Sequence, residues 1–291
     1  MKTIQYSIQH LRFHFSVFLL PVFLFAMSRA ADPFHWKTAI LFVLLHLLVY
    51  PSSNAYNSIQ DRDTGSIGGL KHPPPIPTTL SGVTIFLDSL ALVSSAWFFG
   101  LEVFLLLGSY ILASRAYSYR GIRIKRFPLG GFALVASLQG GLIYFITSMV
   151  ASQQSFFELG TDTFLGALAA TVMIGAGYPI TQIYQHEQDR LDGVNTLSMR
   201  LGEKGTLLFS ASLFALFTAF IFLLRWETSF VGLLFLLVTT PTVFFFLYWM
   251  RLISRDLRAA NYDNTMRMNV ISTITLNVFF TTLLIIQKWS Q

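Results

Sequence analysis

The sequence has no cysteine and few charged residues for its length. Without cysteine, the chain can form neither disulfides nor thiolate metal sites. Charged residues make up 12% and hydrophobic residues 54% of the 291 residues, whereas soluble domains carry about 25% charged residues. The net charge is +6, but the basic residues form no continuous run of the kind that binds nucleic acid. The composition therefore excludes an ordinary soluble domain and argues against a nucleic-acid partner.

Long apolar runs take the place of the missing charge. Each is roughly 17 to 25 residues long, which is enough to cross a bilayer as an α-helix. The nine runs cover residues of about 12–29, 38–57, 79–99, 101–117, 128–150, 163–184, 205–224, 229–250 and 268–287. Strands are excluded because the runs do not alternate and an open sheet edge cannot lie in lipid. The sequence predicts an all-α integral membrane protein in which nine transmembrane helices form one bundle.

The lysines and arginines are distributed unevenly over the predicted loops. If the N-terminus is cytoplasmic, sixteen of the twenty lie inside, and only Arg29, Lys37, Arg225 and Lys288 lie outside. Because positively charged loops stay on the cytoplasmic side, we expect a multi-pass protein of the cell (inner) membrane with its C-terminus outside. A cleaved secretory signal ending near residues 28–30 is the alternative and would leave eight crossings, although Arg29 suits a cleavage site poorly.

One motif occurs twice in the chain. Residues 50–65 have the sequence Y-P-S-S-N-A-Y-N-S-I-Q-D-R-D-T-G, and residues 178–193 have the sequence Y-P-I-T-Q-I-Y-Q-H-E-Q-D-R-L-D-G. The copies follow the second and sixth predicted helices, so four helices separate them and both point the same way in the membrane. This spacing predicts two four-helix parallel repeats plus a ninth helix. Because such symmetry commonly places a membrane site at the repeat interface, we expect one site built from two halves.

The repeated motif carries oxygen donors at helical spacing. In each copy three amide or carboxylate side chains are three and four residues apart, so they would share one helix face. They are Asn54, Asn57 and Asp61 in the first copy and Gln182, Gln185 and Asp189 in the second. Magnesium prefers such oxygen ligands and is usually held by one or two carboxylates plus substrate phosphates. The motif therefore predicts a Mg²⁺ site for a phosphate-bearing substrate.

On these motifs the chain resembles the UbiA-type intramembrane prenyltransferases. Residues 53–61, with the sequence S-N-A-Y-N-S-I-Q-D, occupy the positions of the first motif of that family, N-D-x-x-D-x-x-x-D. The second, D-x-x-D-x-x-x-D followed by a glycine and T-L-x-x-x-L-G, matches residues 182–202. A Y-S-x-x-x-x-R-L-K segment after helix four matches residues 117–125. The resemblance covers the whole chain, and it implies a single transmembrane domain over residues 1–291 with motif-bearing cytoplasmic loops at about 54–78 and 182–204.

The resemblance also implies a function in quinone or lipid biosynthesis. Family members transfer a prenyl group from a prenyl diphosphate to a lipid-soluble, often aromatic acceptor, and Mg²⁺ and basic groups stabilise the departing diphosphate. By this resemblance Asp61 and Asp189 are catalytic, and the six oxygen donors named above bind metal. The diphosphate would be bound by Lys71, Tyr117, Arg120, Arg123, Lys125 and Arg126, while Asp63, Glu187 and Asp88 could also turn toward the site.

The chain departs from the family pattern at four motif positions. Only the last aspartate of each copy is kept, and Asn54, Asn57, Gln182 and Gln185 stand where the family has aspartates. An amide oxygen can ligate a cation but adds no charge, so we expect fewer or more weakly held metal ions. The alternative function is a non-catalytic UbiA-like protein or a transporter that binds a lipid diphosphate. Motifs at the membrane edge favour the enzyme, because transport sites lie near the midplane.

A few polar residues outside the motifs have simpler explanations. Asp88 lies in the middle of the third apolar run, where a charge is costly, so it either lines the cavity or is protonated and hydrogen-bonded to a neighbouring helix. We expect His186 to make a loop hydrogen bond. We expect Asn261, Asp263 and Asn264 to cap the last helix.

Overall fold

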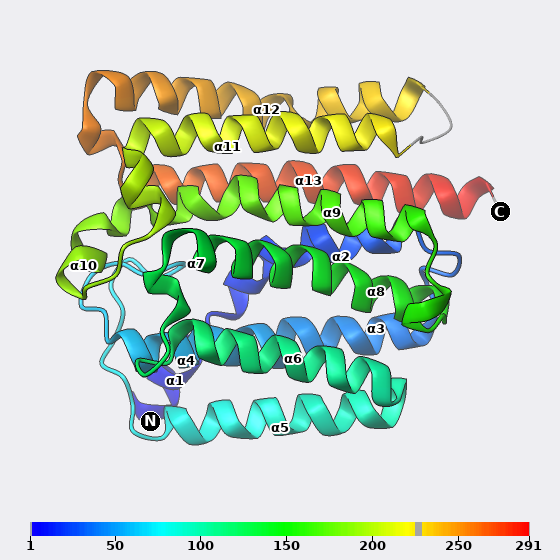
Figure 1. Ribbon diagram of the computed structural model, residues 1–291, viewed down its shortest axis with the longest axis horizontal. Helices are drawn as coiled ribbons and strands as arrows, with labels where there is room; N and C mark the ends of the chain where they lie inside the picture. Colours follow the sequence, from blue (N-terminus) through cyan, green and yellow to red (C-terminus); the bar gives the residue numbers. More distant parts are fainter. Residues whose placement is uncertain (1, 225–228, 291) are drawn as a thin grey trace.

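The computed structural model describes residues 2–224 and 229–290. Within these residues the regular structure is entirely helical, which confirms the predicted class. The helices lie side by side in one bundle with the chain termini at opposite ends (Figure 1). Arg225, one of the four basic residues expected outside the cytoplasm, lies outside the described residues.

The first half of the chain, residues 2–118, contains the first motif copy near its middle. Their bounds are α1 Lys2–Leu11, η1 Phe13–Leu19, α2 Leu20–Met27, α3 Trp36–Val43, η2 Leu44–Val49, α4 Tyr50–Asp61, α5 Leu80–Phe99 and α6 Leu101–Ser118. The second half contains η3 Ile124–Arg126, α7 Pro128–Val135, η4 Ala136–Leu142, α8 Ile143–Ser152, η5 Phe156–Glu158, α9 Thr161–Gly177, η6 Tyr178–Gln185, α10 His186–Leu191 and α11 Leu197–Leu223. It continues with α12 Ser229–Arg255, η7 Leu257–Ala259 and α13 Tyr262–Ser290.

Eight helical stretches of the described residues are long and apolar enough to cross a membrane. They correspond to eight of the nine predicted runs. The run predicted at 101–117 forms α6, which packs beside α5 (Figure 1). Helix α6 carries Glu102 in its first turn and Arg115 in its last turn, and it is not among the eight stretches. With α6 included, the bundle agrees approximately with the nine-helix prediction.

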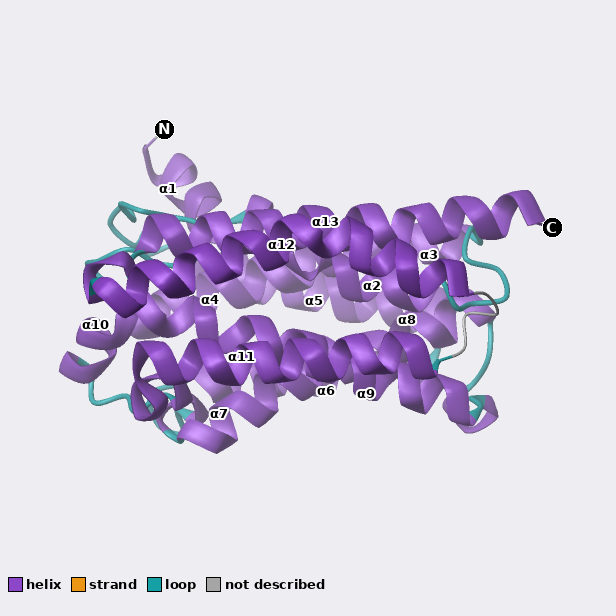
Figure 2. Ribbon diagram, turned by 90° about the horizontal axis from the view of Figure 1, so that it is seen from above, coloured by secondary structure: helices purple, strands orange, loops and turns teal. Residues whose placement is uncertain are grey.

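Both motif copies lie at the same end of the bundle, here called the motif end. The loops after α4, α6, α10 and α12 meet there, and the N-terminus lies there too (Figure 1). Helix α1 projects from this end, whereas the C-terminus lies at the opposite end (Figure 2). The predicted parallel repeat requires this arrangement, because helices with the same orientation must deliver their motifs to one edge.

The two copies begin with the same Tyr-Pro pair but adopt different helix types. A proline ring clashes with the carbonyl four residues earlier, so the helix around it must adjust. At Pro51 the adjustment precedes the proline, as the wide π-type turn η2, and α4 then runs regularly to Asp61. At Pro179 it includes the proline, as the tight 3₁₀ segment η6. With three residues per turn, η6 aligns Gln182 with Gln185.

The best-packed part of the core lies toward the opposite end. Phe25 stacks on Phe280 with ring centroids 4.9 Å apart and meets the Tyr144 ring edge-on. Close helix approach supports this packing: a Cβ on Gly140 would lie 2.5 Å from the Ala170 carbonyl oxygen of α9. The dense aromatic cluster closes the bundle at one end and leaves open space at the motif end.

Candidate functional site

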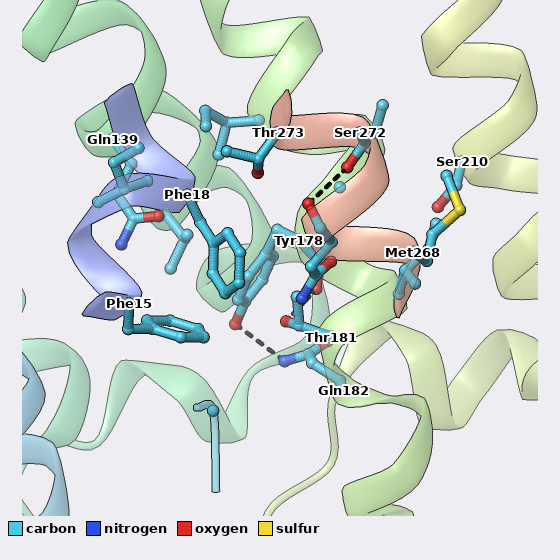
Figure 3. A pocket seen from close by; sticks show the side chains of 18 of the residues that line it. Phe15, Phe18, Gln139, Tyr178, Thr181, Gln182, Ser210, Met268, Ser272 and Thr273 are labelled. Carbon is cyan, nitrogen blue, oxygen red and sulfur yellow. Dashed lines mark hydrogen bonds between the residues drawn. The ribbon is translucent and has the colours of Figure 1, made fainter. Parts of the chain in front are cut away.

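A cavity of about 720 Å³ begins at the motif end and extends into the bundle. Figure 3 shows part of its wall, with Phe15 and Phe18 of η1 on one side of Tyr178 and Met268 of α13 on the other. Near the motifs the lining side chains are polar, and deeper in the bundle they are mainly apolar, as at Leu138 of η4. The cavity therefore joins a polar mouth to an apolar interior.

Both motif copies face this cavity. The six side chains predicted as metal ligands line it, together with Asp63, Tyr117 and Lys125 from the other predicted site residues. Helix α4 contributes the first copy, and η6 with α10 contributes the second. The structure thus brings the two halves of the repeat to one surface, as the parallel repeat requires.

In the first copy, Asp61 is buried and paired with cations. Its Oδ1 accepts a hydrogen bond from Lys125 Nζ at 2.5 Å and lies 3.6 Å from Arg123 Nη2. The exposed fraction is 2% for the Asp61 side chain and 9% for that of Lys125. Asn57 is also engaged, because its Oδ1 accepts a hydrogen bond from Ser118 Oγ at 2.7 Å. The side-chain oxygens of Asn57 and Asp61 are therefore occupied by partners from the end of α6 and from η3.

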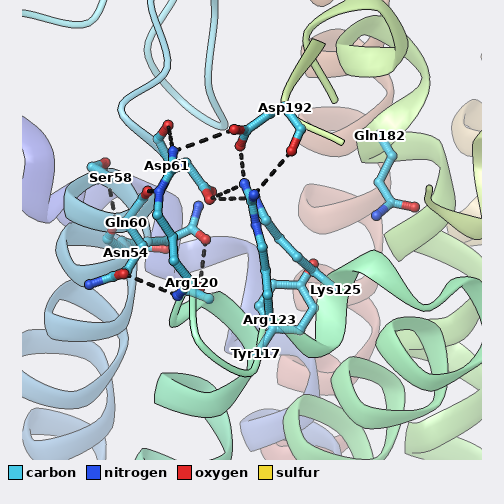
Figure 4. A network of polar contacts seen from close by, with 12 residues as sticks. Asn54, Ser58, Gln60, Asp61, Tyr117, Arg120, Arg123, Lys125, Gln182 and Asp192 are labelled. Carbon is cyan, nitrogen blue, oxygen red and sulfur yellow. Dashed lines mark hydrogen bonds and ion pairs between the residues drawn. The ribbon is translucent and has the colours of Figure 1, made fainter. Parts of the chain in front are cut away.

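The loop after α6 also binds the loop after α10 (Figure 4). Arg123 forms an ion pair with Asp192 and donates to its carbonyl oxygen at 3.0 Å. Arg120 donates to the Gln60 carbonyl oxygen at 2.6 Å and lies 3.4 Å from the Asp192 carboxylate. These contacts fasten the two motif copies to each other. Neither arginine lines the cavity, although both were predicted to bind diphosphate.

The second copy is less occupied. Among the described residues Asp189, which is half-buried, forms no ion pair. Gln182 donates from Nε2 to the Tyr178 hydroxyl at 2.8 Å, and that hydroxyl lies 2.5 Å from the hydroxyl of Tyr117. Gln182 Oε1 is buried without a hydrogen-bond partner within the described part of the chain. Tyr178, the first residue of its motif copy, was not among the predicted site residues, although a tyrosine begins both copies.

Arg12 is a second cavity residue that the sequence analysis missed. Its guanidinium is buried, lines the cavity, and donates to the carbonyl oxygens of Asn54 at 2.6 Å and Gly68 at 2.9 Å. The 62–79 loop can come this close because a Cβ on Gly68 would lie 2.7 Å from the Phe15 ring. In the sequence, Arg12 is a lone arginine before an apolar run. Such a residue also fits the positive-inside rule, and Arg12 was used only to predict the orientation of the chain in the membrane.

Besides Arg120 and Arg123, four further predicted site residues lie away from the cavity. Lys71 is exposed and forms an ion pair with the exposed Asp263 at 2.7 Å. Arg126 is exposed, with its guanidinium 4.8 Å from the centroid of the Phe127 ring. Glu187 is also exposed. Asp88 is the fourth, and it forms an ion pair with Arg115.

The interpretation of Asp88 as a cavity residue is corrected by its partner. Arg115, one turn from the end of α6, forms an ion pair with Asp88 and donates to Ser52 Oγ at 2.7 Å. The same guanidinium lies 4.2 Å from the centroid of the Tyr56 ring. Arg115 therefore supplies the opposite charge for Asp88 inside the bundle, and the pair lies outside the cavity lining.

The expectation about His186 is confirmed, and the expectation of helix caps holds for Asn261 alone of its three residues. His186 forms a hydrogen bond through Nε2 with Ser198 Oγ at 2.7 Å. The backbone N–H of Asn264 donates to Asn261 Oδ1 at 3.0 Å, so Asn261 caps α13. Asp263 instead binds Lys71 and links the start of α13 to the 62–79 loop.

The residues present fit a divalent cation held with few protein charges. No three His, Cys, Asp or Glu side chains of the described chain surround one point, but Mg²⁺ needs only one or two carboxylates when phosphates supply the rest. The unpaired carboxylate of Asp189 and the unpartnered oxygen of Gln182 are donors of the right kind. Burial, followed by the nearby Asp61 carboxylate, raises the pKa of Asp63, the other free carboxylate on the cavity wall.

Comparison with known proteins identifies one family. The model of the UbiA prenyltransferase family matches residues 18–271. No curated protein matches the chain significantly in sequence.

Solved structures with the same fold carry little sequence identity to this chain. A UbiA homologue from Archaeoglobus fulgidus bound to GPP and Mg²⁺ has a TM-score of 0.65 at 17% identity, covering 96% of this chain and 99% of its own. An apo UbiA homologue from Aeropyrum pernix K1 has a TM-score of 0.61 at 16% identity, covering 97% and 98%. A structure from a study of digeranylgeranylglyceryl phosphate synthase has a TM-score of 0.60 at 17% identity, covering 98% of both chains. At these identities the match shows the fold.

Proposed function

The chain belongs to the UbiA prenyltransferase family, and we propose that it is a membrane enzyme that transfers a prenyl group from a prenyl diphosphate to a lipid-soluble acceptor. One observation carries the proposal: both motif copies and Lys125 line the polar mouth of a cavity whose interior is apolar. A prenyl diphosphate has the same two parts, a charged head and an apolar chain. The homologue from A. fulgidus that binds GPP and Mg²⁺ supports this substrate class.

The diphosphate head would lie between the two motif copies. Lys125 and Arg12 are the cations on the cavity wall there, and their charges would stabilise the negative charge that develops on the leaving diphosphate. A bound Mg²⁺ would add to this stabilisation as a Lewis acid. Asp61 would hold Lys125 in place, and Asp189 with Gln182 would face the metal. These side chains would act on the leaving group rather than on the acceptor.

The prenyl chain would extend into the apolar part of the cavity. Where the polar mouth meets this apolar part, the bond between the allylic carbon and the diphosphate oxygen would break and the electron pair would leave with the diphosphate. The acceptor would then capture the allylic cation and lose a proton. Side chains such as Phe18 and Leu138 would exclude water, which would otherwise capture the same cation. We propose a lipid-soluble aromatic acceptor, because an aromatic ring supplies the electron pair and can lose a proton afterwards.

The orientation proposed from the basic loops puts the motif end in the cytoplasm. The head of a prenyl diphosphate is charged and water-soluble, so a cytoplasmic mouth would admit it from the aqueous side. The cavity's position at one end of the bundle also favours an enzyme over a transporter, whose site would lie near the midplane.

A turnover experiment tests the proposal. The purified protein is incubated in liposomes with Mg²⁺, a membrane-lipid extract and radiolabelled geranyl, farnesyl or geranylgeranyl diphosphate. We expect a new labelled lipid and an equal amount of released diphosphate, with neither formed by Asp189→Asn and both retained in Lys204→Met, which changes an exposed cation away from the cavity. Binding of the labelled diphosphate without a new lipid from any extract would instead favour a non-catalytic binding protein.

A further inference from the structure

The two motif copies have the same residue pattern but different partners. In the first copy, the Asp61 carboxylate is 2.5 Å from Lys125 Nζ and 3.6 Å from Arg123 Nη2. Asn57 Oδ1 already accepts a hydrogen bond from Ser118. A divalent cation at Asp61 would therefore lie within a few ångströms of two positive charges, which would repel it. In the first copy, Asp61 therefore supports a cation that belongs to the protein itself, the ammonium group of Lys125.

The second copy has free oxygen atoms. Asp189 lines the cavity and forms no ion pair with another described residue. Gln182 is 7% exposed, and its Oε1 has no hydrogen-bond partner within the described part of the chain. A buried amide oxygen without a partner costs free energy, so a ligand is expected to satisfy it. Figure 4 shows Gln182 set apart from the cation cluster around Asp61.

The orientation of the Gln182 oxygen is held by its own amide nitrogen. Nε2 donates to the Tyr178 hydroxyl at 2.8 Å (Figure 3). The Tyr178 hydroxyl is in turn hydrogen-bonded to that of Tyr117 at 2.5 Å. With the nitrogen fixed, Oε1 is the atom left for a ligand. Tyr117 comes from α6, so the first half of the chain helps to position a donor of the second half.

We propose that the two halves divide the binding of the diphosphate head: the second copy holds one divalent cation through Asp189 and Gln182 Oε1, and Lys125, supported by Asp61, takes the place of a second cation. This inference rests on the proposed function, because it takes a diphosphate as the ligand that bridges the halves. It explains why the chain keeps one of the family's aspartates in each copy, Asp61 in the first and Asp189 in the second. One carboxylate orients an ammonium group, and the other ligates a metal.

Metal counting tests the division directly. Mn²⁺ alone, as a paramagnetic substitute for Mg²⁺, is titrated into the purified protein in detergent, and the free ion is measured by electron paramagnetic resonance. We expect one Mn²⁺ per chain in wild type and in Asp61→Asn. Asp189→Asn should bind Mn²⁺ about tenfold or more weakly, as expected on loss of a metal ligand or its close support. Two ions per chain in wild type, or equal losses in the two aspartate variants, would overturn the inference.

A second variant keeps the test valid if Asp189→Asn fails to fold. Gln182→Glu adds a charge at the free oxygen without changing the side-chain length, so it should bind Mn²⁺ more tightly than wild type. An unchanged Mn²⁺ affinity in Gln182→Glu would contradict a metal at this position. Elution volume and thermal melting confirm that each variant is folded before its ions are counted.

The role of Lys125 is measured without metal. Inorganic pyrophosphate is titrated calorimetrically in the presence of a chelator, which removes divalent ions. We expect wild type to bind pyrophosphate, and Lys125→Met to bind it about ten- to a hundredfold more weakly, as for loss of a hydrogen bond to a charged group. The matched control Lys204→Met should bind like wild type. Pyrophosphate affinity that is unchanged in Lys125→Met would overturn this half of the inference.

These measurements are independent of turnover. One Mn²⁺ per chain together with no labelled lipid would refute the proposed transferase but leave the division of the site intact. Two Mn²⁺ per chain together with a labelled lipid would refute the division and leave the transferase intact.

Discussion

The ion pair between Asp61 and Lys125 supports a quantitative prediction about stability. Both side chains are almost fully buried, so solvent screens their interaction little. Asp61 has a second cation nearby in Arg123 at 3.6 Å, whereas Lys125 has no other carboxylate within ion-pair distance among the described residues. Removing the two partners should therefore have unequal effects. Asp61→Asn leaves Lys125 buried without an anion, but Lys125→Met leaves Asp61 still facing Arg123.

The magnitudes follow from the cost of an uncompensated buried charge. Breaking a buried pair by removing one partner costs about 3–5 kcal/mol, so Asp61→Asn should lower the free energy of unfolding by about this amount. Lys125→Met should cost less, about 1–3 kcal/mol, because Arg123 keeps Asp61 partly neutralised. In the double variant Lys125 is no longer an unpaired charge, so the double loss should fall short of the sum by about 1–3 kcal/mol.

A double-mutant cycle measures this coupling. Unfolding of the wild type, the two single variants and the double variant is followed by circular dichroism in mixed micelles of increasing denaturing-detergent content. The matched control is Lys204→Met combined with Asp61→Asn, whose effects should add, because Lys204 is exposed and donates to the Ser254 carbonyl oxygen rather than to Asp61. If the Asp61 and Lys125 effects add to within about 0.5 kcal/mol, the two groups do not interact as described and the reasoning is refuted.

Four further outcomes are expected. Asp189→Asn should reduce prenyl diphosphate turnover by about a hundredfold or more. Its melting temperature should stay near that of wild type, because the carboxylate has no ion-pair partner to lose. Turnover equal to wild type would contradict the role of Asp189. Arg115→Met should lower the melting temperature by several degrees and leave the affinity for prenyl diphosphate unchanged, because Arg115 neutralises Asp88 outside the cavity. Lys71→Ala should change diphosphate affinity by less than about twofold, because an exposed ion pair contributes only about 0–1 kcal/mol and the side chain lies away from the cavity; a tenfold loss would restore the role that the sequence motif predicted for it. Single cysteines at Thr64 or Leu191, both exposed at the motif end, should react with an impermeant thiol reagent only when it reaches the cytoplasmic side, and labelling from outside intact cells would reverse the proposed orientation.

The sequence alone determined the class of the protein and the general location of its site. Apolar runs of membrane-spanning length allow only helices in lipid, because every backbone polar group must be satisfied within the segment. The repeat at Tyr50 and Tyr178 set two helix ends in the same orientation, and a parallel repeat brings such ends to one edge. The six oxygen donors could be identified because helical spacing places them on one face of their own helix, which is a local property of the chain.

The tertiary structure decided which charges meet. Asp88 and Arg115 lie on different helices, and no local spacing indicates that they form a pair. Arg12 fits the positive-inside rule equally well whether its guanidinium faces water or, as observed, the cavity. Lys125 and Asp61 are far apart in sequence but 2.5 Å apart in space. Ion pairs depend on distances between elements, and helix packing sets these distances. For this reason the two motif copies, alike in sequence, have different electrostatic surroundings.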